Sequence, residues 1–230
     1  ASNTEENQYV LSQIPTNRQW NYTIGGSWRH FRDNAYRTFV VSRNYLNNSA
    51  QKYVDNDDSN EANKLLDYQS TEAENKLRIE ETVRKDDWKI NYGAGIEWAE
   101  YTTTTFQKLE NEVTLNYSSE IGVFKYVAFG QVSKGVLSER LQLSLGARMD
   151  ANNFNAHMAN PLNQFSPRLS ASYRISQKMA INFNTGIYYQ LPPYTTLGYR
   201  NTAGELVNKD VKYIQSKHVV LGIEYNTSKN

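Results

Sequence analysis

The sequence predicts an all-β chain, an antiparallel up-and-down meander of about 9–10 long strands that is part or whole of a transmembrane β-barrel. Three observations predict it. Apolar and polar residues alternate over long stretches, short and long connections alternate between these stretches, and tryptophans stand at both ends of two of them. A period of two indicates strands, because successive side chains of a strand point to opposite faces of the sheet.

The composition is compatible with this fold. The 230 residues carry a formal net charge of +1 and no cysteine, which gives no electrostatic case for a nucleic-acid partner and excludes disulfides. The chain contains 17 tyrosines, 8 phenylalanines and 4 tryptophans, and such aromatic content argues against disorder. No apolar run approaches the roughly 18 residues of a membrane helix. In a strand barrel, by contrast, only alternate residues face lipid.

The alternation predicts nine strands and identifies their apolar side. The expected strands are 20–31, 35–47, 65–84, 87–107, 119–134, 138–153, 166–176, 179–191 and 212–226, with Gln8–Gln13 as a candidate tenth. The residues expected to face lipid are Leu141, Leu143, Leu145, Leu169, Tyr173, Ile175, Ile181, Phe183 and Ile187. The opposite parity is rich in Ser, Asn, Gly, Gln and Arg, a composition typical of a hydrated lumen or of a surface that packs on a polar plug.

The connections between the expected strands fall into two classes that alternate along the chain. Short turns are expected at about 32–34, 85–86, 135–137 and 176–178, and long polar loops at about 48–64, 108–118, 155–165 and 192–211. In a meander this order puts every short turn at one rim and every long loop at the other, as in outer-membrane barrels. We therefore treat residues 1–230 as a single β-barrel segment.

Tryptophans bracket the apolar side of two strands. Trp20 and Trp28 lie eight residues apart, and Trp88 and Trp98 lie ten apart. At about 3.3 Å per residue these spacings correspond to roughly 26–33 Å before tilt, close to the height of an apolar band between aromatic girdles. The four tryptophans are therefore predicted to form parts of such girdles.

Several short motifs resemble the barrel of TonB-dependent outer-membrane receptors, particularly those of the Bacteroidetes type. They are Gly146-Ala147-Arg148-Met149-Asp150, Ser166-Pro167-Arg168 and Tyr189-Gln190-Leu191-Pro192-Pro193, in this order. The resemblance implies a 22-stranded barrel with an N-terminal plug domain, which imports a nutrient such as a siderophore, glycan or peptide with energy passed on by TonB. This chain shows no plug and too few strands, so we expect a segment of the barrel domain.

The resemblance also implies where the protein works and with what. The location would be the outer membrane of a Gram-negative bacterium. The partners would be membrane lipid, the remaining strands and plug of the receptor, TonB through that plug, and a small ligand of unknown identity.

Candidate sites are few. His30, His157 and His218 are scattered, and the acidic run 54–61 lacks the central glycine and final glutamate of a calcium loop, so we expect no metal, cofactor or enzymatic activity. The loop after residue 191 is the richest in aromatic and arginine side chains. Tyr194, Tyr199 and Arg200 are therefore the candidate substrate contacts, and the structural alternative is that they pack the base of the loop.

Two other architectures fit parts of the pattern. The first is a complete small outer-membrane barrel that acts as a pore, an adhesin or a structural anchor, and a tenth strand would favour it because such barrels close with an even number of strands. The second is a soluble β-sandwich or ligand-binding barrel, which requires an apolar interior and short strands.

Overall fold

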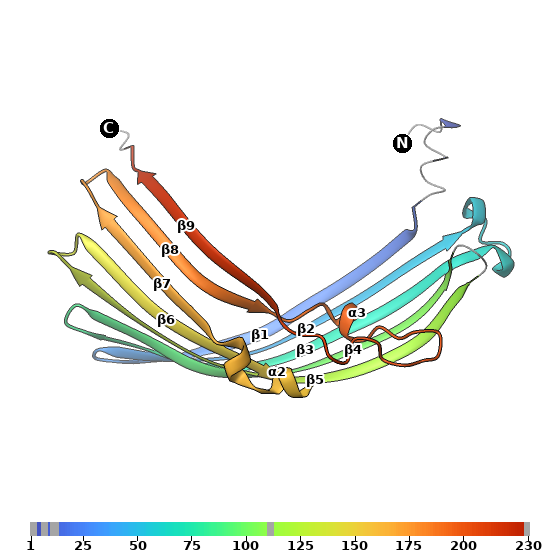
Figure 1. The fold of residues 1–230 in the computed structure, drawn as a ribbon, viewed down its shortest axis with the longest axis horizontal. Helices are drawn as coiled ribbons and strands as arrows, with labels where there is room; N and C mark the ends of the chain where they lie inside the picture. The colour runs from blue at the N-terminus through green and yellow to red at the C-terminus, as the bar shows by residue number, and fades with distance from the viewer. Residues whose placement is uncertain (1–3, 6–8, 10–13, 110–112, 228–230) are drawn as a thin grey trace.

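The protein is described by a computed structural model that covers residues 4–5, 9, 14–109 and 113–227. It contains one antiparallel sheet in which nine strands pair in chain order (Figure 1). The predicted meander is therefore confirmed. The strands are β1 (Thr16–Arg32), β2 (Ala35–Tyr53), β3 (Lys64–Lys85), β4 (Trp88–Lys108), β5 (Thr114–Val136), β6 (Leu141–Asn152), β7 (Ser166–Arg174), β8 (Met179–Gln190) and β9 (Ile214–Tyr225). The connections contain the short helices η1 (Val54–Asn56), η2 (Glu61–Asn63), α2 (Ala156–Ala159), η4 (Pro161–Gln164) and α3 (Tyr194–Leu197).

The two ends of the sheet differ. Figure 1 shows the tight turns at one end, and the connections that carry short helices lie toward the other. We call the first end the short-turn rim and the second the loop rim. The turn between β5 and β6 occupies residues 137–140, not the predicted 135–137, because β5 continues through Val136. Leu137, Ser138 and Glu139 make the turn with φ of 56°, 55° and 63°.

Two of the connections predicted to be long are shorter. Strand β2 continues to Tyr53, so the loop expected from residue 48 begins at Val54. Strand β5 begins at Thr114, which reduces the loop expected at 108–118 to five residues. In residues 48–53 neither parity is consistently apolar, and in residues 114–118 the apolar residues Leu115 and Tyr117 belong to the parity of the polar face. The expected alternation is therefore lost, although the backbone ladder continues, as in the pairs Asn48↔Ser70 and Thr105↔Tyr117.

The sheet is open. β1 and β9 are its edges, and the described residues form no pair between them. An open sheet of nine strands is not the closed, even-numbered barrel of the first alternative, and a single sheet is not the sandwich of the second. The candidate tenth strand at Gln8–Gln13 falls, apart from Tyr9, on residues outside the described ranges. No helix within those ranges is long and apolar enough to span a membrane.

The register keeps one parity on one face through all nine strands. Val41, Leu77, Ile96 and Tyr126 are successive partners from β2 to β5. Leu145, Leu169, Thr185 and Val219 are successive partners from β6 to β9, and Val132 of β5 links the two sets by pairing with Leu145. We call this the apolar face and the opposite one the polar face.

The polar face of β4 has no room for a side chain at Gly93. A Cβ there would lie 2.5 Å from the Ile79 carbonyl oxygen and 2.7 Å from the Phe129 ring. The carbonyl belongs to the backbone of the neighbouring strand and cannot step aside, so Gly93→Val is expected to destabilise the fold by about 1–3 kcal/mol. Gly130 on β5 has no atom within 4 Å of such a Cβ. Gly130→Val is the control, and equal losses in urea unfolding would contradict the expected difference.

Candidate functional site

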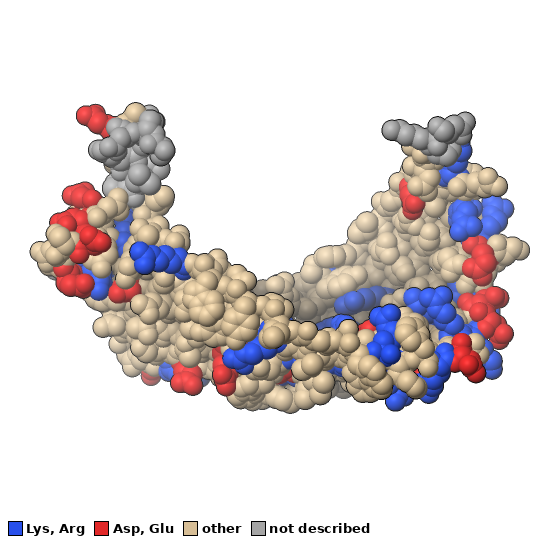
Figure 2. Space-filling view, turned by 180° about the vertical axis from the view of Figure 1, so that it is seen from behind, with Lys and Arg blue, Asp and Glu red and all other residues tan. Residues whose placement is uncertain are grey.

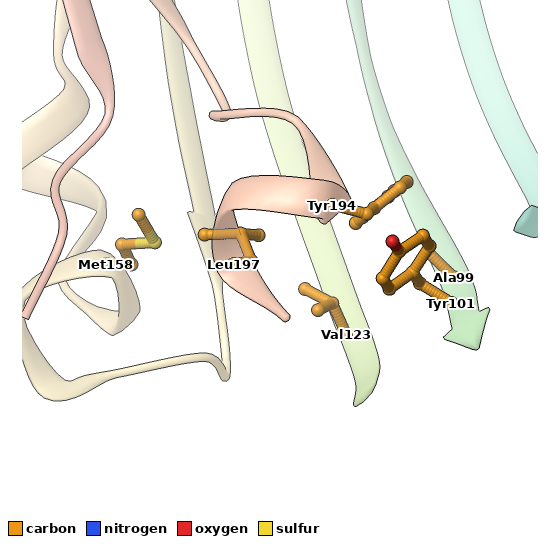
Figure 3. Packing of buried hydrophobic residues seen from close by; sticks show 6 residues of the cluster. All are labelled: Ala99, Tyr101, Val123, Met158, Tyr194 and Leu197. Carbon is orange, nitrogen blue, oxygen red and sulfur yellow. The ribbon is translucent and has the colours of Figure 1, made fainter. Parts of the chain in front are cut away.

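The connection between β8 and β9 folds back onto the polar face near the loop rim. Tyr194 and Leu197 of α3 pack against Ala99, Tyr101 and Val123 of β4 and β5, and all five are buried (Figure 3). The Tyr194 and Tyr101 rings stack with centroids 6.2 Å apart. This buried apolar cluster therefore does not lie between two layers of sheet. It fastens one connection to the wall formed by β4 and β5.

Beside this cluster lies an ionic group formed by Glu74, Glu97, Lys125 and Tyr194, which we call the anchor cluster. The Lys125 Nζ lies 3.2 Å from a Glu74 oxygen and also forms an ion pair with Glu97. The Tyr194 hydroxyl donates to Glu74 Oε1 at 2.7 Å and accepts a hydrogen bond from Lys125 Nζ at 2.6 Å. Lys76 completes the charge balance, 2.6 Å from Glu74 and 3.4 Å from Glu97.

The hydroxyl of Tyr194 is suited to this position only when it is protonated. Burial raises the pKa of Tyr194 well above its usual range, and the Glu74 carboxylate beside it acts in the same direction. The phenol therefore remains a donor throughout the physiological range, and it ties α3 to β3 and β5 together.

Removing this hydroxyl is expected to weaken the fold. Tyr194→Phe loses two hydrogen bonds to charged groups, so we expect a loss of about 1–3 kcal/mol in the free energy of unfolding, together with faster proteolysis of residues 191–213. Tyr199→Phe is the control, because Tyr199 is 37% exposed and packs on Tyr117 by ring contact at 5.8 Å. Equal losses in the two variants would contradict the anchoring role of the hydroxyl.

The three candidate substrate contacts thus lie in one segment but differ in exposure. Tyr194 is 8% exposed and belongs to the anchor cluster, whereas Tyr199 is partly open to solvent. Arg200 donates from Nε to Ser119 Oγ at 3.2 Å and from Nη1 to the Gly204 carbonyl at 2.9 Å. All three hold the segment against β3, β4 or β5, and Tyr199 presents the most surface.

Sequence reasoning missed the residues that join this segment to the preceding loop. Asn155 accepts from the Met158 N–H as the N-cap of α2 and donates to the Val211 carbonyl at 2.8 Å. Asn152, fully buried, donates to the Tyr213 hydroxyl at 2.9 Å. Asparagines in a polar loop carry no pattern by themselves, so the sequence offered no signal that they bridge the loops 153–165 and 191–213.

A cavity of about 360 Å³ opens on the polar face next to the anchor cluster. Strands β3 to β6 and β8 line it together with the segment that precedes β9. Its charged lining residues are Lys76, Arg78, Glu97, Lys125, Arg148 and Asp150. Each of these cations has a carboxylate partner. Lys76 and Lys125 pair with Glu74 and Glu97 of the anchor cluster. Arg78 lies 3.6 Å from Glu80 and Arg148 lies 2.7 Å from Asp150, so the charges of the lining are balanced by these partners. In the described part of the chain, no group of three or more His, Cys, Asp or Glu residues is placed to hold a metal ion.

The residues expected to face lipid have one parity. The strand pairings place those that belong to β6, β7 and β8 on the apolar face, and they place the four tryptophans on the same face. Ile175 lies in the turn that follows β7. Leu145 is 59% exposed and Trp28 is 61% exposed. A groove of about 560 Å³ on this face is lined mainly by apolar residues of β1 to β5, among them Ile24, Val41 and Leu77.

A curved meander with an exposed apolar face, a polar face that carries docked loops, and turns and loops at opposite rims defines a segment of an outer-membrane β-barrel. The family model described as "TonB dependent receptor-like, beta-barrel" matches residues 2–230. The chain belongs to this family, and it is part of the barrel of a TonB-dependent receptor.

Solved structures show the same fold at low sequence identity. The copper transporter OprC is 18% identical with a TM-score of 0.66, and the match covers 91% of this chain and 36% of that one. A ferric enterobactin receptor of Pseudomonas aeruginosa is 17% identical with a TM-score of 0.67, covering 92% and 33%. The siderophore receptor PirA of the same organism is 14% identical with a TM-score of 0.61, covering 93% and 38%. No curated protein sequence matches significantly. The chain spans about a third of the length of these receptors.

Proposed function

We propose that this chain forms part of the lumen wall and ligand-binding surface of a receptor that imports a nutrient across the outer membrane of a Gram-negative bacterium. The observation that carries the proposal is the cavity on the polar face, placed directly beneath a connection that the anchor cluster holds in position. The remaining strands, a plug and TonB would complete the transport machinery. The motifs around Gly146–Asp150 favour a receptor of the Bacteroidetes type.

The two arginines of the cavity favour an anionic metal chelate as the ligand. Arg78 and Arg148 line the cavity, and each guanidinium keeps N–H donors beyond those that face its own carboxylate partner, Glu80 or Asp150. A neutral glycan gains less from such charged donors than an anion does. Of the solved structures with this fold, one is named a ferric enterobactin receptor and another a siderophore receptor. Tyr199 and Arg200, at the outer end of the anchored segment, would add contacts from above.

Competition binding to the full-length receptor tests this proposal. We expect an anionic ferric chelate to bind and a neutral oligosaccharide not to compete. The double substitution Arg78→Gln/Arg148→Gln should weaken binding of the chelate at least tenfold, because the ligand loses a charge-assisted hydrogen bond at each of the two positions. The control is Arg84→Gln, an exposed arginine of β3 nearer the short-turn rim and outside the cavity lining. Tight binding of the oligosaccharide, unaffected by the double substitution, would replace the chelate by a glycan.

A further inference from the structure

Two arginines share one carboxylate on the apolar face at the short-turn rim. Arg32 is the last residue of β1, and Arg37 of β2 pairs in register with Glu81 of β3. The Arg37 Nε donates to Glu81 Oε2 at 2.9 Å, and Arg32 forms an ion pair with the other carboxylate oxygen through Nη2. Three strands therefore bring two cations and one anion to a single point.

This group of three side chains has a net positive charge and guanidinium N–H donors that Glu81 does not use. The Glu81 side chain is 9% exposed, whereas those of Arg32 and Arg37 are 47% and 42% exposed. Two guanidiniums against one carboxylate leave one net positive charge. Each guanidinium has five N–H groups, and the contacts with Glu81 use Nη2 of Arg32 and Nε and Nη2 of Arg37. Donors therefore remain for a second anion.

Other cations lie along the same border. The Lys134 Nζ lies 4.6 Å from the centroid of the Trp88 ring, and the Arg140 guanidinium lies 5.6 Å from that of Tyr173. Figure 2 shows basic side chains, mixed with acidic ones, gathered at the end of the molecule that carries the short turns. Toward the middle of the sheet, Arg37 is followed on its face by Phe39, whose partners are Trp28 and Ile79. The positively charged group of Arg32, Arg37 and Glu81 therefore lies next to an apolar surface.

We propose that Arg32 and Arg37 bind the phosphate of an anionic glycerophospholipid, while Glu81 holds the two guanidiniums in place and Phe39 and its neighbours contact an acyl chain. Guanidinium groups match the geometry of phosphate oxygens and remain charged at any physiological pH. A zwitterionic headgroup carries its own ammonium, so it gains less from the excess positive charge. The inference rests on the proposed function, because it requires the apolar face to lie in a bilayer.

Lipid selectivity tests the site. The full-length receptor would be reconstituted in membranes of phosphatidylcholine with a small fraction of phosphatidylglycerol, and the lipids that remain bound after mild delipidation would be counted by mass spectrometry. Arg32→Gln/Arg37→Gln/Glu81→Gln removes both cations without leaving a buried carboxylate unpaired. We expect it to lower the preference for phosphatidylglycerol about fivefold.

The matched control has the same loss of two cations at the same rim but on the other face. Arg84 and Lys89 are register partners of polar parity, and both are exposed. Arg84→Gln/Lys89→Gln should leave the lipid preference unchanged. Excess inorganic phosphate should not displace the lipid, because it lacks the acyl chains; full displacement would show a site for free phosphate and overturn the lipid assignment.

The two failures are distinguishable. A receptor that enters neither pure phosphatidylcholine nor mixed membranes would contradict the proposed function itself. A receptor that enters both and retains the two lipids in proportion to their supply, with or without the triple substitution, would overturn only the lipid site.

Discussion

Leu145→Arg is expected to destabilise the membrane-inserted protein by about 2–4 kcal/mol. Leu145 lies in the middle of the alternating run Leu141–Met149, and its side chain is exposed on the apolar face. An arginine there would place a charge among lipid chains, far from water. Urea unfolding in lipid vesicles measures the loss.

The control places the same charge on the other face. Asn184 is exposed on the polar face. It precedes Thr185, which pairs with Leu169, and Leu169 pairs in turn with Leu145. Asn184→Arg should therefore change the free energy of unfolding by less than about 1 kcal/mol. Equal losses in the two variants would mean that both faces meet the same medium.

Lys125→Met is expected to be the most damaging change on the polar face. Lys125 lies between Glu74 and Glu97 and binds the Tyr194 hydroxyl, and its side chain is 19% exposed. Its removal leaves two carboxylates with Lys76 as their remaining cation. Breaking a buried ion pair from one side costs about 3–5 kcal/mol; because these groups are partly hydrated, we expect about 3 kcal/mol.

A double-mutant cycle separates this electrostatic loss from lost packing. Glu97→Gln should recover part of the stability in the background of Lys125→Met, since it removes one of the two stranded charges. Strictly additive losses would show that Lys125 stabilises the wall through its aliphatic chain alone.

The strands could be predicted because the two faces meet different surroundings. Where the apolar parity is needed, as in Leu141–Met149, alternation marks the strand plainly. Nearer the loop rim the apolar face no longer carries a regular series of apolar residues, and the strand extensions at 48–53 and 114–118 were not recognised as strand from the sequence. Side-chain alternation therefore predicted that each strand exists. Near the loop rim, however, the length of a strand is set by backbone hydrogen bonding, which produces no pattern in the sequence.

The site was predictable only in part. Tyr194, Tyr199 and Arg200 stood out by composition, and the structure places all three in one docked segment. The partners of Tyr194, Glu74 and Lys125, lie 120 and 69 residues away from it in the chain. Neither has a local motif, and only the register of β3, β4 and β5 brings them together beneath α3.

Spin labelling tests the central claim, that the two faces of this sheet meet lipid and a polar interior respectively. The chain has no cysteine, so Leu145→Cys and Asn184→Cys can each carry a single label. In lipid vesicles the label at residue 145 should relax faster with oxygen, which dissolves in the bilayer, and the label at residue 184 faster with a water-soluble nickel complex. Equal response of both labels to the nickel complex would contradict the account.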